Sequence, residues 1–151
     1  MSVRLQALKV CVLEQLAGVS RHVDIVSPNL EPALFDRDEV ASTFASLARR
    51  GPQTRIRLLI GDDQPGAYGC HRLIALSRRL STACTLRVLR EHPEWNRETL
   101  MLVDRTRGVV VTPSEKKSRI LETRAETQRW ADTFERLWHA GSESLELRQF
   151  Y

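Results

Sequence analysis

The sequence predicts a single α/β domain, residues 1–151, with a mixed β-sheet flanked by helices. Patterns typical of amphipathic helices alternate with short apolar runs along the chain, and this alternation is the order of an α/β fold. Two runs, 99–103 and 109–112, are separated only by the segment DRTRG, which predicts a hairpin and therefore strands of mixed direction. With 42% apolar and 28% charged residues, a chain of this length can bury roughly 70% of its unfolded surface.

Apolar residues recur every three or four positions in four segments, which predicts amphipathic helices. Asp36 is expected to cap the second helix, with Glu39 three residues on completing a box-like capping pattern. Gly51 and Gly141 are expected to end the second and the fourth helix. The four segments are 3–19, 37–50, 70–80 and 122–140.

Short runs rich in β-branched and aliphatic residues predict the strands. In the hairpin, Gly108 is expected to supply the positive φ of the turn. Segment 28–36, which holds two prolines, and the basic segment 113–119 are expected to be loops. The expected strands are 22–27, 54–60, 85–89, 99–103 and 109–112, with a final short edge strand at 144–150.

Cysteine usage and hydropathy favour a cytoplasmic protein without a metal site or a cofactor. The three cysteines, Cys11, Cys70 and Cys84, form no CxxC pair and are an odd number, so we expect reduced thiols. The longest apolar runs span only a few residues, and charged residues interrupt the first fifteen. We therefore expect neither a transmembrane helix nor a signal peptide.

The positive charge is concentrated in the middle of the chain. The net charge is +4, and residues 49–129 hold 17 basic and 9 acidic side chains, whereas the segments on either side are slightly acidic. Such a distribution favours an anionic partner, with nucleic acid as one candidate. Because 20 of the 23 basic residues are arginines spread along the chain, solvated surfaces explain the same distribution equally well.

The segment RETLMLVDRTRGVVVTPSE has the arrangement of a strand, a tight turn and a second strand. In this arrangement it resembles the phospholipase D-like domain family, whose motif is His-x-Lys-x4-Asp. Arg97 stands at the histidine position, Thr99 at the lysine position and Asp104 at the aspartate position. The segments SPNLEPALFD, RIRLLIGD and ADTFERLW extend the resemblance over nearly the whole chain. It also covers uncharacterised bacterial domains that are often attached to GNAT-type acetyltransferases.

The resemblance implies a phospholipase D-like half-unit whose catalytic motif is degenerate. In the family, the histidine attacks phosphorus while the lysine offsets the oxyanion charge. A guanidinium such as that of Arg97 binds phosphate but is no nucleophile, and the hydroxyl of Thr99 is a poor replacement for an ammonium. Ser114 fits the family's downstream small-residue segment, whereas Glu115 would repel a phosphate.

Several other residues are weaker candidates for chemistry. His92 precedes Arg97 by five residues and is a possible displaced base, although an exposed loop histidine explains it more simply. Cys70 and His71 are neighbours on a predicted helix, where adjacent side chains diverge by about 100°, so they are poorly placed to act together. Asp62 and Asp63 follow a strand and are explained by a turn.

Six basic residues are candidates for an anion-binding site at the end of the sheet, and Trp95 is a candidate to stack on a base or cover a pocket. The six are Arg97, Arg105, Arg107, Lys116, Lys117 and Arg119.

The leading hypothesis is a catalytically degenerate phospholipase D-like module that binds a phosphate-bearing or protein partner. One alternative is a divergent phosphodiesterase or nuclease, and another is a structural accessory domain for an acetyltransferase. The family pairs two motif copies, and this chain holds one, so the resemblance implies a homodimer. Any nucleic-acid binding is expected to be weak, insensitive to base sequence and sensitive to salt.

Overall fold

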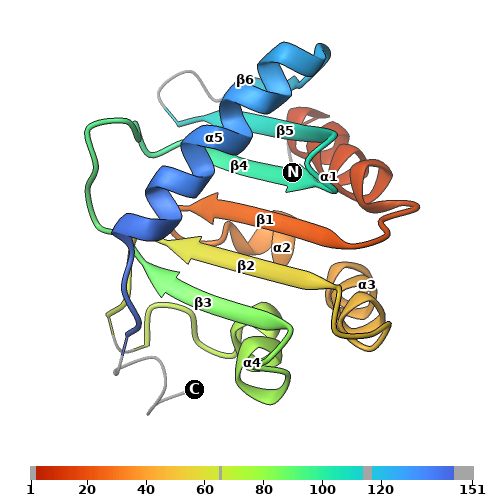
Figure 1. Ribbon diagram of the computed structural model, residues 1–151, viewed down its shortest axis with the longest axis vertical. Helices are drawn as coiled ribbons and strands as arrows, with labels where there is room; N and C mark the ends of the chain where they lie inside the picture. The colour runs from red at the N-terminus through yellow and green to blue at the C-terminus, as the bar shows by residue number, and fades with distance from the viewer. Residues whose placement is uncertain (1–2, 65, 114–116, 145–151) are drawn as a thin grey trace.

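A computed structural model of the chain describes residues 3–64, 66–113 and 117–144. Its centre is a six-stranded mixed sheet in the order β3-β2-β1-β4-β5-β6 (Figure 1). β1, β2 and β3 are parallel, whereas β4 pairs antiparallel with β1, and β5 and β6 continue antiparallel from it. The strands are β1 (His22–Ser27), β2 (Arg55–Ile60), β3 (Cys84–Val88), β4 (Thr99–Val103), β5 (Arg107–Thr112) and β6 (Lys117–Ile120). The α/β mixed sheet expected from the sequence is confirmed.

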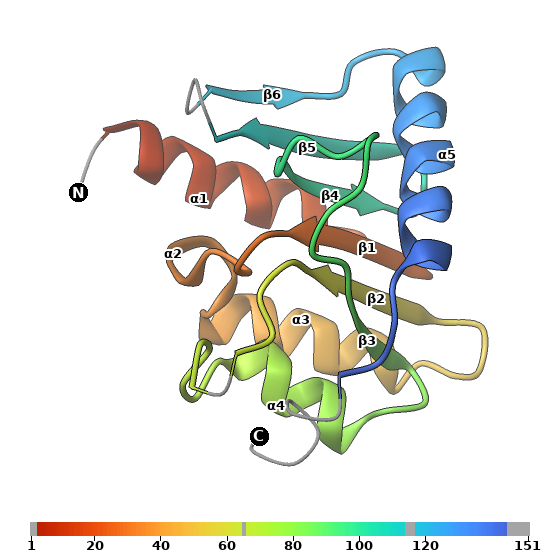
Figure 2. The ribbon, with the colours of Figure 1, turned by 90° about the vertical axis from the view of Figure 1, so that its left-hand side faces the viewer.

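Helices cover both faces of the sheet, and each face has its own apolar core (Figure 2). Four helices lie on one face: α1 (Val3–Leu16), α2 (Pro32–Phe35), α3 (Asp38–Ala48) and α4 (Arg72–Arg79). On the other face, the one helix among the described residues is α5 (Arg124–Ala140), which crosses the sheet diagonally (Figure 1). Alternation along β1 illustrates the two cores, since Ile25 packs toward the four helices and Val26 toward α5.

Two elements lie where loops were expected. Residues 117–120 form the edge strand β6, paired antiparallel with β5, so the expectation of a loop over 113–119 was wrong there. The basic composition of this segment favoured a loop in the prediction. Charged side chains are nevertheless common on edge strands, where they discourage pairing with other chains. The short helix α2 lies within the proline-containing segment 28–36, with Pro32 in its first turn, where a missing N–H costs nothing.

Two local details also differ from expectation. Gly108 does not have a positive φ; the turn uses Asp104 and Arg105, at φ 53° and 58°. Glycine is needed at 108 for space, because a Cβ there would lie 2.5 Å from the carbonyl oxygen of Met101. Asp36 does not cap α3; its carboxylate accepts a hydrogen bond from the backbone N–H of Arg72 and so serves α4.

The end of the chain is only partly described. Ser142 forms an antiparallel bridge with Val88 on the edge strand β3, with hydrogen bonds of 2.7 and 3.0 Å. The expected edge strand at 144–150 lies, apart from Ser144, outside the described residues.

Candidate functional site

The carboxyl ends of the parallel strands and the beginning of β4 meet at one edge of the sheet. Val26 pairs with Leu100, so Ser27 at the end of β1 lies beside Thr99 at the start of β4. The segment 89–98 leads from β3 to β4 across this edge (Figure 2). Ligands of open α/β sheets bind outside the carboxyl ends of strands where the connections diverge, so this edge is the place to look for a site.

Segment 89–98 forms a hollow of about 550 Å³ at this edge, which we call the motif hollow. Its walls bring together Arg97 at the histidine position of the motif, the weaker candidate His92, and Trp95. The residues that line it are Arg90, Glu91, His92, Pro93, Trp95 and Arg97.

Arg97 is held in place by its own loop. Its backbone has φ 61°, a strained value for a residue other than glycine. The guanidinium lies 5.1 Å from the centre of the Trp95 ring, and Nη1 donates to the carbonyl oxygen of Arg90 at 3.0 Å. Gly61 makes room for both, because a Cβ there would lie 3.0 Å from the Trp95 ring and 3.2 Å from Nη1. Nε and Nη2 of Arg97 donate no hydrogen bond within the described part of the chain.

Trp95 is buried and is therefore a poor platform for a base. The residue is 5% exposed, and its indole N–H donates to the carbonyl oxygen of Glu98 at 2.9 Å. The ring supports Arg97 from below, as a cation–π contact. Trp95 thus covers the apolar core at this edge and positions the guanidinium.

Thr99 joins two strands through its hydroxyl. Its Oγ1 lies 3.0 Å from Oγ of the fully buried Ser27, which also accepts the backbone N–H of Leu30 at 3.0 Å. The hydroxyl of Thr99 therefore holds the end of β1 against the start of β4. Among the described residues, no base is hydrogen-bonded to this hydroxyl to activate it as a nucleophile.

His92 is bound in a tautomer unsuited to nucleophilic attack. Its Nδ1 accepts the backbone N–H of Glu94 at 3.1 Å, so in the neutral ring the proton is on Nε2. Attack on phosphorus needs a free lone pair on a ring nitrogen, and here one lone pair is occupied and the other nitrogen is protonated.

Asp104, the motif aspartate, stabilises the opposite edge of the sheet. Its carboxylate accepts the backbone N–H groups of Ser20, Arg21 and His22 at 2.8 to 2.9 Å. Burial acts to raise the pKa of this carboxyl, but the hydrogen bonds from His22, Arg21 and Ser20 together hold the pKa below its usual range. The carboxylate thus ties the entry to β1 to the hairpin.

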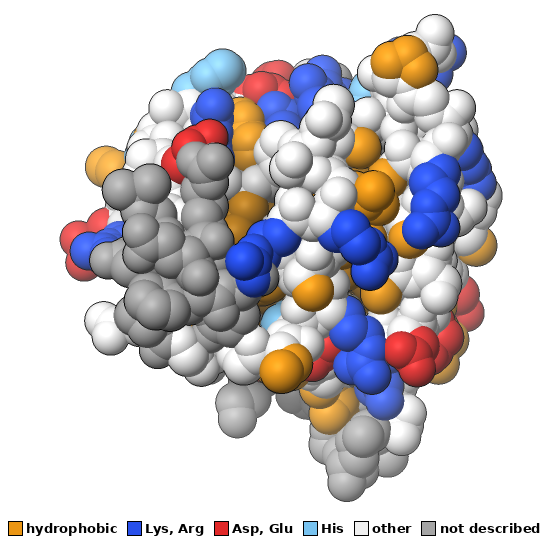
Figure 3. Space-filling view, turned by 90° about the horizontal axis from the view of Figure 1, so that it is seen from below, with side chains coloured by type: hydrophobic (Ala, Val, Ile, Leu, Met, Phe, Trp, Pro, Cys, Tyr) orange, Lys and Arg blue, Asp and Glu red, His pale blue; other side chains and the backbone are white. Residues whose placement is uncertain are grey.

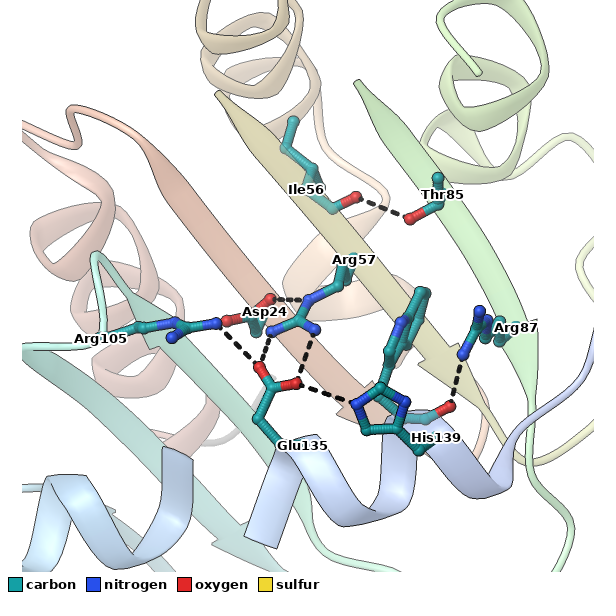
Figure 4. A network of polar contacts seen from close by, with 9 residues as sticks. Asp24, Ile56, Arg57, Thr85, Arg87, Arg105, Glu135 and His139 are labelled. Carbon is teal, nitrogen blue, oxygen red and sulfur yellow. Dashed lines mark hydrogen bonds and ion pairs between the residues drawn. The ribbon is translucent and has the colours of Figure 1, made fainter. Parts of the chain in front are cut away.

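The six residues considered for one anion site do not converge within the described structure. Arg105 and Arg107 follow β4 and lie at the opposite edge from Arg97, a separation of about 17 Å along a five-residue strand. Arg105 binds Glu135 on α5 (Figure 4), and Arg107 donates to the carbonyl oxygens of Gln15 and Ala17.

The three remaining basic candidates belong to the segment around β6. Arg119 forms an ion pair with Glu126 on α5. Lys116 lies outside the described residues, and of Lys117 only the backbone, at the start of β6, is described.

The other sequence candidates are structural. His71 caps α4, its Nδ1 accepting from Leu73 and its Nε2 lying 2.9 Å from the carbonyl oxygen of Leu30, while Cys70 beside it is exposed. Asp63 forms an ion pair with Arg90 at 2.7 Å, and Asp62 accepts the N–H of Gln64 within a turn. Among the described residues, no group of three or more His, Cys, Asp or Glu side chains is placed to hold a metal ion.

Arg90, Gly61 and Ser27 belong to this edge, and sequence reasoning did not single them out. For Arg90 and Gly61 the available signal was their position directly after a predicted strand. Helices in the described ranges give no candidate membrane span, since each is too short or too polar.

The fold resembles that of two solved structures of known proteins. NucT from Helicobacter pylori, with a phospholipase D-like fold, aligns with a TM-score of 0.67 and 9% identity over 95% of each chain. TrmBL2, described as an archaeal chromatin protein with a novel mode of DNA binding, aligns with a TM-score of 0.65 and 8% identity. That alignment covers 91% of this chain and 50% of the TrmBL2 chain. At these identities the likeness establishes the fold alone.

The search of curated proteins gives no match. The family described as "Domain of unknown function (DUF7931)" matches residues 4–150, which is nearly the whole chain. The chain therefore belongs to the DUF7931 family, with a phospholipase D-like fold.

Proposed function

We propose that the motif hollow binds the phosphate groups of a nucleic acid without cleaving it. The observation that carries this proposal is the placement of Arg97 at the histidine position of the motif. Its ring contact and its bond to Arg90 fix the guanidinium, while Nε and Nη2 keep their donors unused within the described chain. A fixed guanidinium with unused donors suits a phosphate oxygen, and it has no lone pair with which to attack phosphorus.

The two structural neighbours add support of a general kind. TrmBL2 is described as binding DNA, and its fold resembles this one over most of this chain. The basic middle segment of the sequence would strengthen binding to any polyanion. Of the two arginines that line the motif hollow, Arg90 is paired with Asp63, and the Trp95 side chain is buried, so we expect the affinity to be independent of base sequence.

Titration of a labelled single strand tests the proposal. Between about 50 and 200 mM salt, Arg97→Gln should weaken binding and lower the salt slope by about 0.7, the contribution of one phosphate contact on a single strand. Arg129→Gln is the matched control, because Arg129 is exposed on α5, has the same charge and lies outside the motif hollow. An equal loss in both variants, or no binding by the wild type at the low-salt end, contradicts the proposal and favours a protein partner.

A divergent phosphodiesterase is the second candidate, because His92 and Arg97 line the same hollow. We expect no hydrolysis of bis(p-nitrophenyl) phosphate, since the Nδ1 lone pair of His92 is engaged by Glu94. Hydrolysis that disappears in His92→Ala but persists in His139→Ala would establish the enzyme instead.

We also propose a homodimer, because the phospholipase D-like family that the sequence resembles pairs two motif copies, and this chain carries one. The hairpin and α5 are the elements that we expect at the interface. At about 100 μM, any dimer with a micromolar Kd is almost fully formed. Light scattering at that concentration should therefore give the mass of two chains. A single-chain mass there would exclude it.

A further inference from the structure

A second and larger hollow lies on the α5 side of the sheet, away from the carboxyl edge. Because α5 crosses the sheet diagonally, it leaves the amino-terminal halves of β2 and β3 uncovered (Figure 1). The hollow has a volume of about 880 Å³. We call it the arginine cleft after four of its lining residues, Arg55, Arg57, Arg78 and Arg87.

The four arginines reach the cleft from three elements. Arg55 and Arg57 alternate along β2 and so project from the same face of the sheet, with Arg87 on the neighbouring strand β3. Arg78 comes from the last turn of α4. Figure 3 views the molecule from below, at the end where β3 and α4 lie, and several Lys and Arg side chains gather near the middle of this view.

Arg57 forms the floor of the cleft and is fully engaged (Figure 4). It is 4% exposed; its Nε donates to Asp24 at 2.7 Å and its Nη1 to Glu135 at 3.1 Å. The guanidinium also lies 4.9 Å from the centre of the Phe134 ring. Its two carboxylate partners neutralise it, so Arg57 is a structural residue of the cleft.

The other three arginines have no carboxylate partner among the described residues. Arg87 donates to the carbonyl oxygen of Trp138 at 2.9 Å and lies 4.6 Å from the centre of its indole ring. Arg78 is exposed. The Nε of Arg55 is buried and has no hydrogen-bond acceptor in the described part of the chain. A buried donor without an acceptor is costly, so a ligand oxygen at that point would be favourable.

The charge balance of the cleft favours an anion. Four arginines line it against two glutamates, Glu135 and Glu143, and Glu135 is already bound to Arg57 and Arg105. Burial, and then the charge of Arg57, lower the pKa of Arg55, which means that its positive charge is poorly compensated. The hydroxyl of Thr85 adds a polar group to the same wall.

We propose that the arginine cleft is a second binding site, for the phosphate groups of a nucleotide or of a nucleic-acid backbone, with Arg55, Arg78 and Arg87 as the residues that contact phosphate. Guanidinium groups hold phosphate oxygens by charge-assisted, often paired, hydrogen bonds. Trp138 is 7% exposed and already carries Arg87, and the imidazole of His139, the other described ring that lines the cleft, lies 3.7 Å from Glu135. Recognition through phosphate alone makes this site insensitive to base identity, and it stands independently of the motif hollow.

The double variant Arg55→Gln/Arg78→Gln tests the site, because neither side chain has a described partner whose loss would harm the fold. The control, Arg49→Gln/Arg79→Gln, removes two exposed arginines that lie outside the cleft and changes the net charge equally. The probes are a labelled single strand of about 12 nucleotides, within the usual span of one small domain, and pyrophosphate. The cleft variant should weaken binding of the better probe roughly tenfold or more and lower the strand's salt slope by about 1.4, while the control stays near wild type.

The two probes separate the sources of the phosphate. Tighter binding of the strand than of pyrophosphate assigns the cleft to a nucleic-acid backbone, and the reverse order assigns it to a small phosphorylated molecule. Equal losses in the cleft and control variants would overturn the proposal, as would a failure of both probes to bind. Combining Arg97→Gln with the cleft variant shows whether the two sites are separate. If they are, the fold-losses in strand affinity of the two variants multiply.

Discussion

The motif hollow and the arginine cleft lie on the same sheet, but they use their polar groups differently. Beside the motif hollow, Thr99 is bound to Ser27. Within the hollow, Arg90 is paired with Asp63, and Nδ1 of His92 accepts from its own loop, whereas Nε and Nη2 of Arg97 have no acceptor in the described part of the chain. In the arginine cleft, Arg57 alone is neutralised, and three guanidinium groups around it lack a described carboxylate partner. The comparison teaches that the position of a family motif and the place where a protein concentrates charge need not coincide.

Removing the floor of the cleft should have the largest effect. Arg57→Met leaves the buried carboxylate of Asp24 without its partner, and loss of one member of a buried pair costs about 3–5 kcal/mol of unfolding free energy. Denaturant unfolding measures this loss. Asp24→Leu/Arg57→Met should recover most of it, since no buried charge remains at this pair. A loss below about 1 kcal/mol in the single variant would mean that Arg57 is less engaged than its contacts indicate.

The motif aspartate should matter for stability and not for binding. Asp104→Asn replaces an acceptor of three backbone N–H groups, and we expect a loss of about 1–3 kcal/mol. The native pKa of Asp104 is depressed, so its contribution is full above the unfolded value of about 3.9 and is lost as pH falls through the native pKa. The difference in unfolding free energy between wild type and Asp104→Asn, measured by denaturant unfolding, should therefore disappear in strong acid. Asp132→Asn, on the exposed face of α5, is the control.

His71 should make the carboxyl edge sensitive to mild acid. Burial lowers the pKa of this imidazole, so between its native pKa and about 6.5 the unfolded chain binds the proton and the folded chain does not. As the pH is lowered through that window, the free energy of unfolding should decrease by up to about 1.4 kcal/mol per pH unit. His71→Asn keeps an N-cap and removes this slope. A residual slope is expected from His22, whose pKa burial also lowers, and an unchanged slope would exclude His71 as its source.

The smallest effect should come from filling the space under Arg97. Gly61→Ala places a methyl group against the Trp95 ring and Nη1 of Arg97, and we expect a cost of about 1 kcal/mol as these side chains shift. The emission of Trp95 should change, and strand binding should weaken as in Arg97→Gln while pyrophosphate binding in the cleft is retained. Unchanged emission would show that the loop yields elsewhere.

The sequence predicted the order of the main helices and strands well, because apolar periodicity is strong in segments such as β2 and α5. The sequence-based prediction was wrong at β6, because pairing at the sheet edge and not apolar periodicity makes this segment a strand. It was also wrong about Gly108, where glycine is required by the close approach of Met101 on β4 and not by a positive φ. Of the three motif positions, Thr99 begins β4, Arg97 lies in the loop before it and Asp104 in the turn after it. Nothing in the sequence indicated the arginine cleft, because it depends on strand register and on the diagonal path of α5, both of which are long-range properties.

The position of α5 in the chain has a consequence for how the protein is made. The six described strands precede α5 in the sequence, yet α5 is the one described helix on its face of the sheet, on which Val26, Leu59 and Leu102 are buried. Glu135, the second carboxylate partner of Arg57, also belongs to α5. During synthesis from the N-terminus, this apolar face stays open to water until α5 has emerged. A nascent or truncated chain that lacks α5 is thus the form most in need of a chaperone, because its exposed apolar face favours aggregation.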